Sequence, residues 1–262
     1  MARNSARGRT RPPLVLIARD PRRAREISRI LKRARIRAAA VPVVRAAAPA
    51  SWRGLDRALK SLADFDAAAF ASANAVEAFF ARARRLRLRK LKAPSRILAV
   101  GPATARSLAR HGWRASLVAG NPGGANLARA AKNVRGLRVL APRAAEGKND
   151  LVRGLRAKGA RVTAAEAYRT VPDSRQRAAL RRLASNPELA AAVFFSGSAV
   201  HAFRAHIGTK AWNRLRRGLL FAALGPTAAQ ALRAAGARKI RQAPRADFKE
   251  LARLLVRALS PS

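Results

Sequence analysis

Small hydroxyl and amide side chains mark the places where this sequence could do chemistry. Each lies just after a predicted strand, at the start of a predicted helix: Ser72, Asn74, Thr104, Ser196, Ser198 and Thr227. Helix N-termini carry unpaired N–H groups and partial positive charge, so these positions favour anions such as carboxylates. Ser, Thr and Asn are also preferred N-cap residues, so each side chain could cap its helix only, or cap it while the backbone binds a ligand.

Three further side chains could act on a bound anion. Tyr168 is the only tyrosine of the chain and lies in an extended segment. A phenol is protonated at neutral pH and can donate its proton to a leaving group. An equally good interpretation is that the Tyr168 ring only packs beside this segment. Arg19 is expected at the end of the first strand and Arg143 in the loop after a strand at 138–141. Guanidinium groups bind carboxylates, but neither position is distinctive among so many arginines.

Other catalytic chemistries lack the residues they need. The chain contains no cysteine, which excludes disulfides, thiolate nucleophiles and cysteine zinc sites. His111, His201 and His206 have no metal-binding spacing, because the last two are five residues apart and do not share a helix face. No glycine-rich motif for nucleotide phosphates is present. We therefore expect neither a metal nor an organic cofactor.

The charge of the chain is unusual. Its 56 Lys and Arg oppose 13 Asp and Glu, giving a net charge of +43, whereas about 2 to 8 suits a small soluble domain. Such a surplus favours non-specific binding of nucleic acid at low salt. Because the basic residues are spread over nearly every predicted helix and only 5% of residues are aromatic, the pattern indicates solvated basic faces rather than a dedicated groove.

Targeting signals are absent from the sequence pattern. No apolar run reaches the roughly 20 residues that span a bilayer, and the basic N-terminus lacks the apolar core of a signal peptide. We therefore expect a cytoplasmic protein without membrane contact.

Short apolar runs alternate with longer helical patterns along the chain, which is typical of βαβ units and parallel sheets. Each predicted strand is followed by a helix, and the strands are expected at 14–18, 67–71, 97–100, 116–118, 138–141, 192–195, 219–224 and 239–241.

Two parts of the sequence match at a fixed offset of 124 residues. The run 70–76 matches 194–200, and Gly101-Pro102 matches Gly225-Pro226. At the same offset Phe79, Leu108 and Gly112 match Phe203, Leu232 and Gly236. Agreement at one offset over about forty residues indicates two similar α/β lobes.

Two extended segments, 38–47 and 161–171, lie at the junctions between the repeats. If they pair, they form a two-stranded ladder between the lobes, where Pro42 and Pro172 are tolerated because such a ribbon has two free edges. The predicted fold class is α/β, with two similar parallel-sheet, flavodoxin-like lobes joined by this ladder and a discontinuous first domain. Its expected divisions are 12–41 plus 172–262 for lobe 1, 45–168 for lobe 2, and 1–11 as a basic disordered N-terminus.

From about residue 14 to residue 259 the sequence resembles the uroporphyrinogen-III synthase family. The resemblance is carried by ASANAVEAFF, ILAVGPATARSL, AEAYRTVP, VFFSGSAVHAF and AALGPTAAQALRAAG, in the family's order and approximate spacing. It implies a cofactor-free lyase of haem biosynthesis, with two lobes around a wide cleft, that cyclises hydroxymethylbilane to uroporphyrinogen III with inversion of ring D and loss of water. By this resemblance Tyr168 is the candidate acid and the hydroxyl and amide residues line the cleft.

The leading hypothesis is therefore a monomeric lyase whose partner is a polycarboxylate tetrapyrrole. The alternative is a highly basic, catalytically weak or inactive variant of the same fold that binds polyanions or nucleic acid. A third hypothesis is a structural or partner-binding paralogue.

Overall fold

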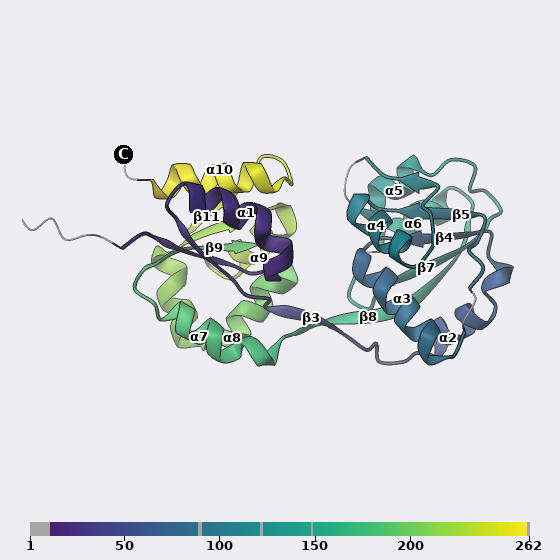
Figure 1. Cartoon of the computed structure of the whole chain (residues 1–262), viewed down its shortest axis with the longest axis horizontal. Coiled ribbons are helices and arrows are strands. Elements are labelled where there is room, and N and C mark those ends of the chain that lie inside the picture. Colours follow the sequence, from purple (N-terminus) through teal and green to yellow (C-terminus); the bar gives the residue numbers. More distant parts are fainter. Residues whose placement is uncertain (1–10, 89–90, 121–122, 148, 261–262) are drawn as a thin grey trace, which may run out of the picture. The chain divides into compact units, whose positions relative to one another are not determined.

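The computed structural model describes residues 11–88, 91–120, 123–147 and 149–260. The basic disordered N-terminus was predicted at residues 1–11, and of these only Arg11 is among the described residues. The chain divides into two compact units, which we call lobe 1 (Met1–Arg45 with Val171–Ser262) and lobe 2 (Ala46–Thr170). Each is an α/β unit with one sheet between two helical layers, so the predicted fold class is confirmed (Figure 1). Within the described residues, no helix combines the length and apolarity needed to cross a membrane.

Lobe 1 is built on a five-stranded parallel sheet with the order β11-β10-β9-β1-β2. Its strands are β1 (Leu14–Ile17), β2 (Arg37–Ala40), β9 (Leu189–Phe194), β10 (Leu220–Ala223) and β11 (Lys239–Gln242). When the strands are numbered within the lobe, this is the flavodoxin-like order. The lobe is therefore doubly wound although its chain is discontinuous.

Two helical layers cover the sheet of lobe 1. Val15 and Ile17 pack against α1 and α10, whereas Leu14 and Leu16 pack on the opposite side against α7, α8 and α9, as the alternation of side chains along a strand requires. The helices are α1 (Pro21–Arg33), α7 (Arg177–Ala184), α8 (Gly197–Gly218), α9 (Pro226–Ala234) and α10 (Phe248–Leu259), with a 3-10 turn η2 (Ser174–Gln176). Helix α8 is broken at Gly208, where φ of 81° and ψ of 167° suit only glycine.

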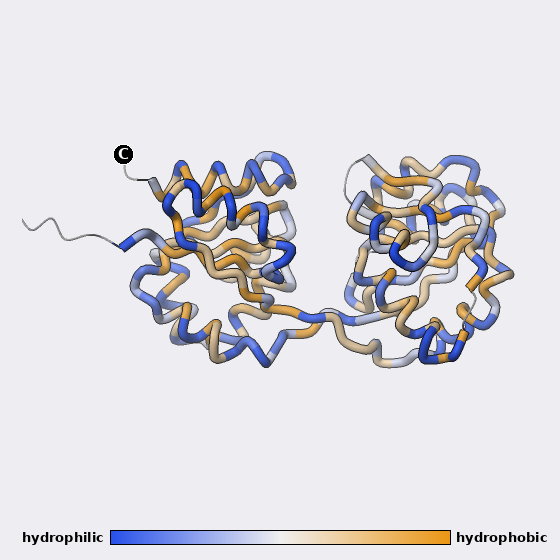
Figure 2. The backbone as a smooth tube through the Cα atoms, viewed as in Figure 1, coloured by the Kyte–Doolittle hydropathy of each residue, from blue (hydrophilic) through white to orange (hydrophobic). Residues whose placement is uncertain are grey.

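Lobe 2 has a six-stranded sheet in the order β3-β8-β7-β4-β5-β6. The strands are β3 (Val44–Ala47), β4 (Ala67–Phe70), β5 (Arg96–Ala99), β6 (Leu117–Val118), β7 (Arg138–Ala144) and β8 (Arg161–Pro172). One layer holds α2 (Arg53–Lys60), the 3-10 turn η1 (Leu62–Asp64), α3 (Ala73–Arg85) and α4 (Pro102–Arg110); the other holds α5 (Gly124–Ala130) and α6 (Asp150–Ala157). In Figure 2 the strands inside each lobe are mostly hydrophobic, whereas hydrophobic and hydrophilic residues alternate along the helices.

The repeat of 124 residues extends well beyond the matching sequence. Leu14 and Arg138 begin β1 and β7, Arg37 and Arg161 begin β2 and β8, and Arg53 and Arg177 begin α2 and α7, all at this offset. Lobe 1 therefore contains β1-α1-β2 from the first repeat and the elements from α7 to α10 from the second. Lobe 2 contains the remainder of the first repeat and β7-α6-β8 from the second. The two repeats have exchanged their first βαβ units.

The ladder at the boundary between the units is shorter than the two segments predicted for it. The stretch 38–47 forms two strands, of which β2 pairs with β1 inside lobe 1 and only β3 lies beside β8. Pro42 separates them, because proline lacks the N–H that a continuous ladder needs. Most of β8 pairs with β7 in the sheet of lobe 2.

Candidate active site

The predicted site residues follow neighbouring strands in both lobes. In lobe 2 the strands β7, β4 and β5 lie side by side and parallel, and in lobe 1 so do β1, β9 and β10. Parallel strands end at the same sheet edge, where ligands commonly bind in open α/β folds. Each lobe therefore gathers its own set of candidate residues at the carboxyl edge of its sheet.

Tyr168 and Ser72 meet in lobe 2, although 96 residues separate them in the chain. The phenol oxygen of Tyr168 lies 3.1 Å from the Ser72 hydroxyl oxygen. Ser72 also caps α3, because its Oγ accepts the Ala75 N–H at 3.1 Å. Tyr168 is paired with Ala144 at the end of β7, and its carbonyl accepts the Ala145 N–H at 2.8 Å. The Tyr168 side chain is only 8% exposed, so its position is fixed by both backbone and packing.

Arg143 lies within a strand, which corrects the prediction of a loop after residue 141. Strand β7 continues to Ala144 because β8 pairs with it over this whole length, although β4 pairs with it only as far as Leu140. Pro142 is tolerated on this free side. The Arg143 side chain donates to the carbonyls of Ala145 and Gly147, so it stabilises the turn after the strand.

The other two candidates of lobe 2 lie in the first turns of their helices. Asn74 is half-buried near the start of α3. Thr104 is only 3% exposed in α4, so its side chain lies inside the lobe. The accessible groups at the start of α4 belong instead to Pro102 and Ala103.

Three hydroxyl residues gather at the sheet edge of lobe 1. Ser196 caps α8 by accepting the Ala199 N–H at 3.3 Å, and its Oγ lies 3.0 Å from the Oγ of Ser198. Thr227 is exposed in the first turn of α9. The two helix starts lie close together: a Cβ on Gly197 would lie 3.2 Å from the Thr227 carbonyl oxygen, so this approach favours glycine there.

Arg19 is held by two aromatic rings that sequence reasoning missed. Its guanidinium carbon lies 4.6 Å from the ring centre of Phe195 and 4.9 Å from that of Phe248. Burial lowers the pKa of Arg19, the charge of Arg23 lowers it further and Asp20 raises it, but a guanidinium remains protonated at neutral pH. Phe195 directly precedes the Ser196 motif, which was the available signal, whereas Phe248 lies too far along the chain to be found that way.

Arg19 and Arg143 occupy equivalent places in the two repeats, since they lie 124 residues apart after β1 and within β7. In both side chains the Nε atom is buried without a hydrogen-bond partner. Stacking between aromatic rings positions the first guanidinium, and backbone carbonyls position the second. Each lobe therefore places one conformationally restrained cation at the same end of its sheet.

Glu77 forms a further polar cluster on α3 of lobe 2. Its carboxylate accepts hydrogen bonds from Ser107 at 2.6 Å and Arg110 at 2.7 Å, and it lies 3.1 Å from Nε2 of His111. The His111 ring stacks on Phe80 with centroids 4.2 Å apart. Burial alone would raise the pKa of Glu77, but the three hydrogen bonds outweigh it and lower the pKa to about 2. The cluster joins α3 to the C-terminal half of α4.

Replacing Glu77 with Gln should reduce the stability of the protein at pH 7. The carboxylate's pKa falls from 4.5 to about 2 on folding, so its contribution is complete above pH 4.5 and disappears as the pH falls through about 2. We expect a loss of about 1 kcal/mol at neutral pH, because the side chain is partly exposed and solvent screens its ion pairs.

Urea unfolding between neutral and acid pH would measure this difference. Glu26→Gln, an exposed change on α1, is the matched control and should leave the pH dependence as in the unsubstituted protein. If the difference in stability between Glu77→Gln and the unsubstituted protein stays constant down to pH 2, the carboxylate charge is not the cause of that difference.

The other two histidines lie in different environments. His206 is buried in α8 and its Nε2 lies 3.0 Å from the Val43 carbonyl oxygen, whereas His201 is exposed. Among the residues with described positions, no three His, Asp or Glu side chains come together as metal ligands.

Comparisons with known proteins place these features in context. A family model described as uroporphyrinogen-III synthase HemD matches residues 25–253. A protein named putative uroporphyrinogen-III synthase from Methanothermobacter thermautotrophicus is 30% identical over 60% of this chain and 62% of its own length. A uroporphyrinogen-III synthase from Synechococcus elongatus is 34% identical over 49% of each. The chain thus matches less than two thirds of the length of either relative.

Solved structures share the fold at low sequence identity. A uroporphyrinogen-III synthetase from Helicobacter pylori aligns over 94% of this chain and 99% of its own, with a TM-score of 0.62 and 16% identity. A mutant uroporphyrinogen III synthase from Thermus thermophilus aligns over 94% and 98%, with a TM-score of 0.56 and 20% identity. At such identities the likeness concerns the two-domain α/β fold.

Proposed function

Because this chain belongs to the uroporphyrinogen-III synthase family, we propose that it cyclises hydroxymethylbilane to uroporphyrinogen III, with inversion of ring D and loss of water, in haem biosynthesis. The observation that carries the proposal is the contact between Tyr168 and Ser72, which places a protected phenol at the carboxyl edge of the lobe 2 sheet. The reaction so proposed needs proton transfer and positioning, and uses no cofactor.

Tyr168 is the proposed acid. The reaction begins when the terminal hydroxyl of the linear tetrapyrrole takes the phenol proton; the C–O bond breaks, water leaves, and a cationic, protonated azafulvene remains beside the Tyr168 phenolate. Ring closure through a spiro intermediate then inverts ring D, and the proton lost from the pyrrole as aromaticity returns restores the phenol. Acid assistance of this kind contributes about 10²- to 10⁴-fold, and the positioning of the substrate supplies the remainder of the rate.

Ser72 is the proposed positioning residue for the phenol. Its Oγ accepts the Ala75 N–H, which leaves its own proton free to be donated to the phenol oxygen of Tyr168. In this arrangement the Tyr168 proton remains available for the leaving group. The same hydrogen bond stabilises the phenolate that forms when the proton has moved.

The carboxylates of the substrate are proposed to bind where helices begin at the sheet edges. In lobe 2 these are the starts of α3 and α4, and in lobe 1 those of α8 and α9. The N–H groups of a first helical turn and the positive end of the helix dipole favour anions. Arg19 adds a fixed positive charge in lobe 1.

Incubation of the full chain with hydroxymethylbilane tests the proposal, with oxidised products separated into type I and type III isomers by chromatography. Type III is the expected product. A reaction without protein is the control, because the substrate closes spontaneously to type I. If the protein yields only type I, the synthase proposal is wrong and the alternative of an inactive basic variant is favoured.

A further inference from the structure

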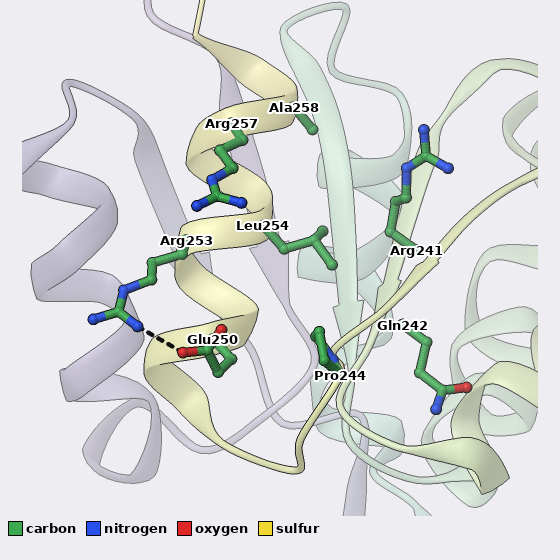
Figure 3. A pocket seen from close by; sticks show the side chains of 8 residues that line it. All are labelled: Arg241, Gln242, Pro244, Glu250, Arg253, Leu254, Arg257 and Ala258. Carbon is green, nitrogen blue, oxygen red and sulfur yellow. Dashed lines mark hydrogen bonds and ion pairs between the residues drawn. The ribbon is translucent and has the colours of Figure 1, made fainter.

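A groove runs along one edge of lobe 1, between the edge strand β11 and helix α10 (Figure 3). Its volume is about 350 Å³, and its lining residues are Arg241, Gln242, Pro244, Glu250, Arg253, Leu254, Arg257 and Ala258. Figure 3 shows Leu254 pointing from α10 towards β11, with Arg241 on the strand and Arg257 on the helix. The groove therefore has an apolar centre between basic sides.

The groove has an excess of unpaired positive charge. Glu250 is the only acidic residue of the lining, and its carboxylate is bound by Arg253 at 2.6 Å. In the described part of the chain, neither Arg241 nor Arg257 forms an ion pair. Two exposed guanidinium groups are thus available to an outside anion.

The cations lie on both sides of the groove: Arg241 on the strand, and Arg253 and Arg257 on the helix. Arg253 and Arg257 are four residues apart on α10, which separates them by about 6 Å along the helix axis. Arg241 lies on the outermost strand of the sheet, whose free edge carries unpaired backbone groups. Cations spread along both sides of a groove suit an extended polyanion better than a compact one.

The lining also indicates how such a polyanion would be bound. Leu254, Pro244 and Ala258 offer apolar contacts suited to sugars, and Gln242 offers an amide donor. None of the described lining residues is aromatic, so the groove offers no aromatic ring on which a base could stack. Contacts to phosphate and sugar position a nucleic acid without reading its sequence.

We propose that the groove between β11 and α10 binds the sugar-phosphate backbone of single-stranded RNA, without preference for base sequence. The net charge of +43 attracts any polyanion to the protein. The groove adds free arginines in a concave site that accommodates one strand. This binding is separate from the proposed synthase reaction and uses none of its residues.

Fluorescence anisotropy of the full chain with a labelled oligouridylate of about 12 nucleotides tests the proposal. The double variant Arg241→Glu/Arg257→Glu should bind more weakly than the unsubstituted protein. Its slope of log affinity against log salt should be shallower by about 1.4, since each lost single-strand phosphate contact removes about 0.7. An oligomer of mixed sequence should bind within a few-fold of the oligouridylate.

Arg177→Glu/Arg182→Glu is the matched control, because it makes the same change in net charge on α7, in the opposite helical layer of lobe 1. It should change the salt slope by less than half as much. Arg241→Gln/Arg257→Gln repeats the test with a milder change should the glutamate variant fail to fold. Equal losses in the α7 and groove variants would overturn the proposal in favour of diffuse attraction, as would binding to phosphatidylserine vesicles without binding to RNA.

Discussion

Replacing Tyr168 with Phe should lower kcat for type III synthesis by about 10²- to 10⁴-fold, with little change in KM. The substitution removes one oxygen atom and keeps the ring that packs in the core of lobe 2. The fold should persist, because the Ser72 hydroxyl still caps α3 when the phenol is absent. A loss confined to kcat identifies an interaction used in the transition state rather than in substrate binding.

Ser72→Ala and Ser196→Ala form a matched pair of controls for Tyr168→Phe. Each removes an N-cap hydrogen bond, to Ala75 in one lobe and to Ala199 in the other, at a cost of about 0.5 to 2 kcal/mol of stability. Only Ser72 contacts the phenol, so only Ser72→Ala should also reduce kcat markedly, though less than Tyr168→Phe. Full type III activity in Tyr168→Phe would show that the phenol only packs.

Phe79→Ala and Phe203→Ala should each destabilise one lobe by about 3 to 5 kcal/mol. The two rings are equivalent in the repeats and both are completely buried. Phe79 lies 5.6 Å from Phe70 and 5.5 Å from Trp113, and Phe203 lies 5.4 Å from Phe194. Either truncation leaves a cavity among aromatic rings, and a loss of this size is large beside the roughly 5 to 15 kcal/mol that holds a typical domain folded.

Hydrogen exchange resolved by peptide would locate each loss. We propose that the lobes fold as separate units, divided close to residues 45 and 170. Phe79→Ala should then increase exchange within 46–170, and Phe203→Ala within 11–45 and 171–260, while the other lobe stays protected. Phe79→Leu and Phe203→Leu, which keep more of the volume, should show smaller effects in the same places. Equal increases in both lobes after either change would show one cooperative unit.

Local sequence pattern was sufficient for the fold class. Alternating apolar runs and helical periods indicated parallel α/β units because the two periodicities, two and 3.6 residues, are properties of single elements. Ser72 and Ser196 were found because an N-cap is set by the residues beside it, and the structure shows both accepting the N–H three residues on. The offset of 124 residues was visible only around these motifs, since helices and strands elsewhere keep their places while their side chains differ.

The order of elements predicted that the N-terminal unit joins the C-terminal half in a discontinuous lobe, but it did not identify which strands pair. Exchange of the first βαβ units depends on β1 pairing with β9 and β7 pairing with β4, and strand partners far apart in the chain are selected by sheet packing. The length of β7 depends likewise on how far β8 pairs with it, which is why Arg143 lies in a strand.

At the candidate site, too, the residue types followed from local sequence pattern, whereas the contacts between them did not. Local sequence pattern was enough to identify the residue types at strand ends and helix starts, because strand and helix boundaries depend on neighbouring residues. Only the tertiary structure brought Tyr168 to Ser72 and placed Arg19 between Phe195 and Phe248. It also placed Arg241 of an edge strand and Arg257 of the last helix in the lining of one groove. These contacts join residues distant in the chain, and their geometry is decided by strand register and by the packing of helices on the sheet.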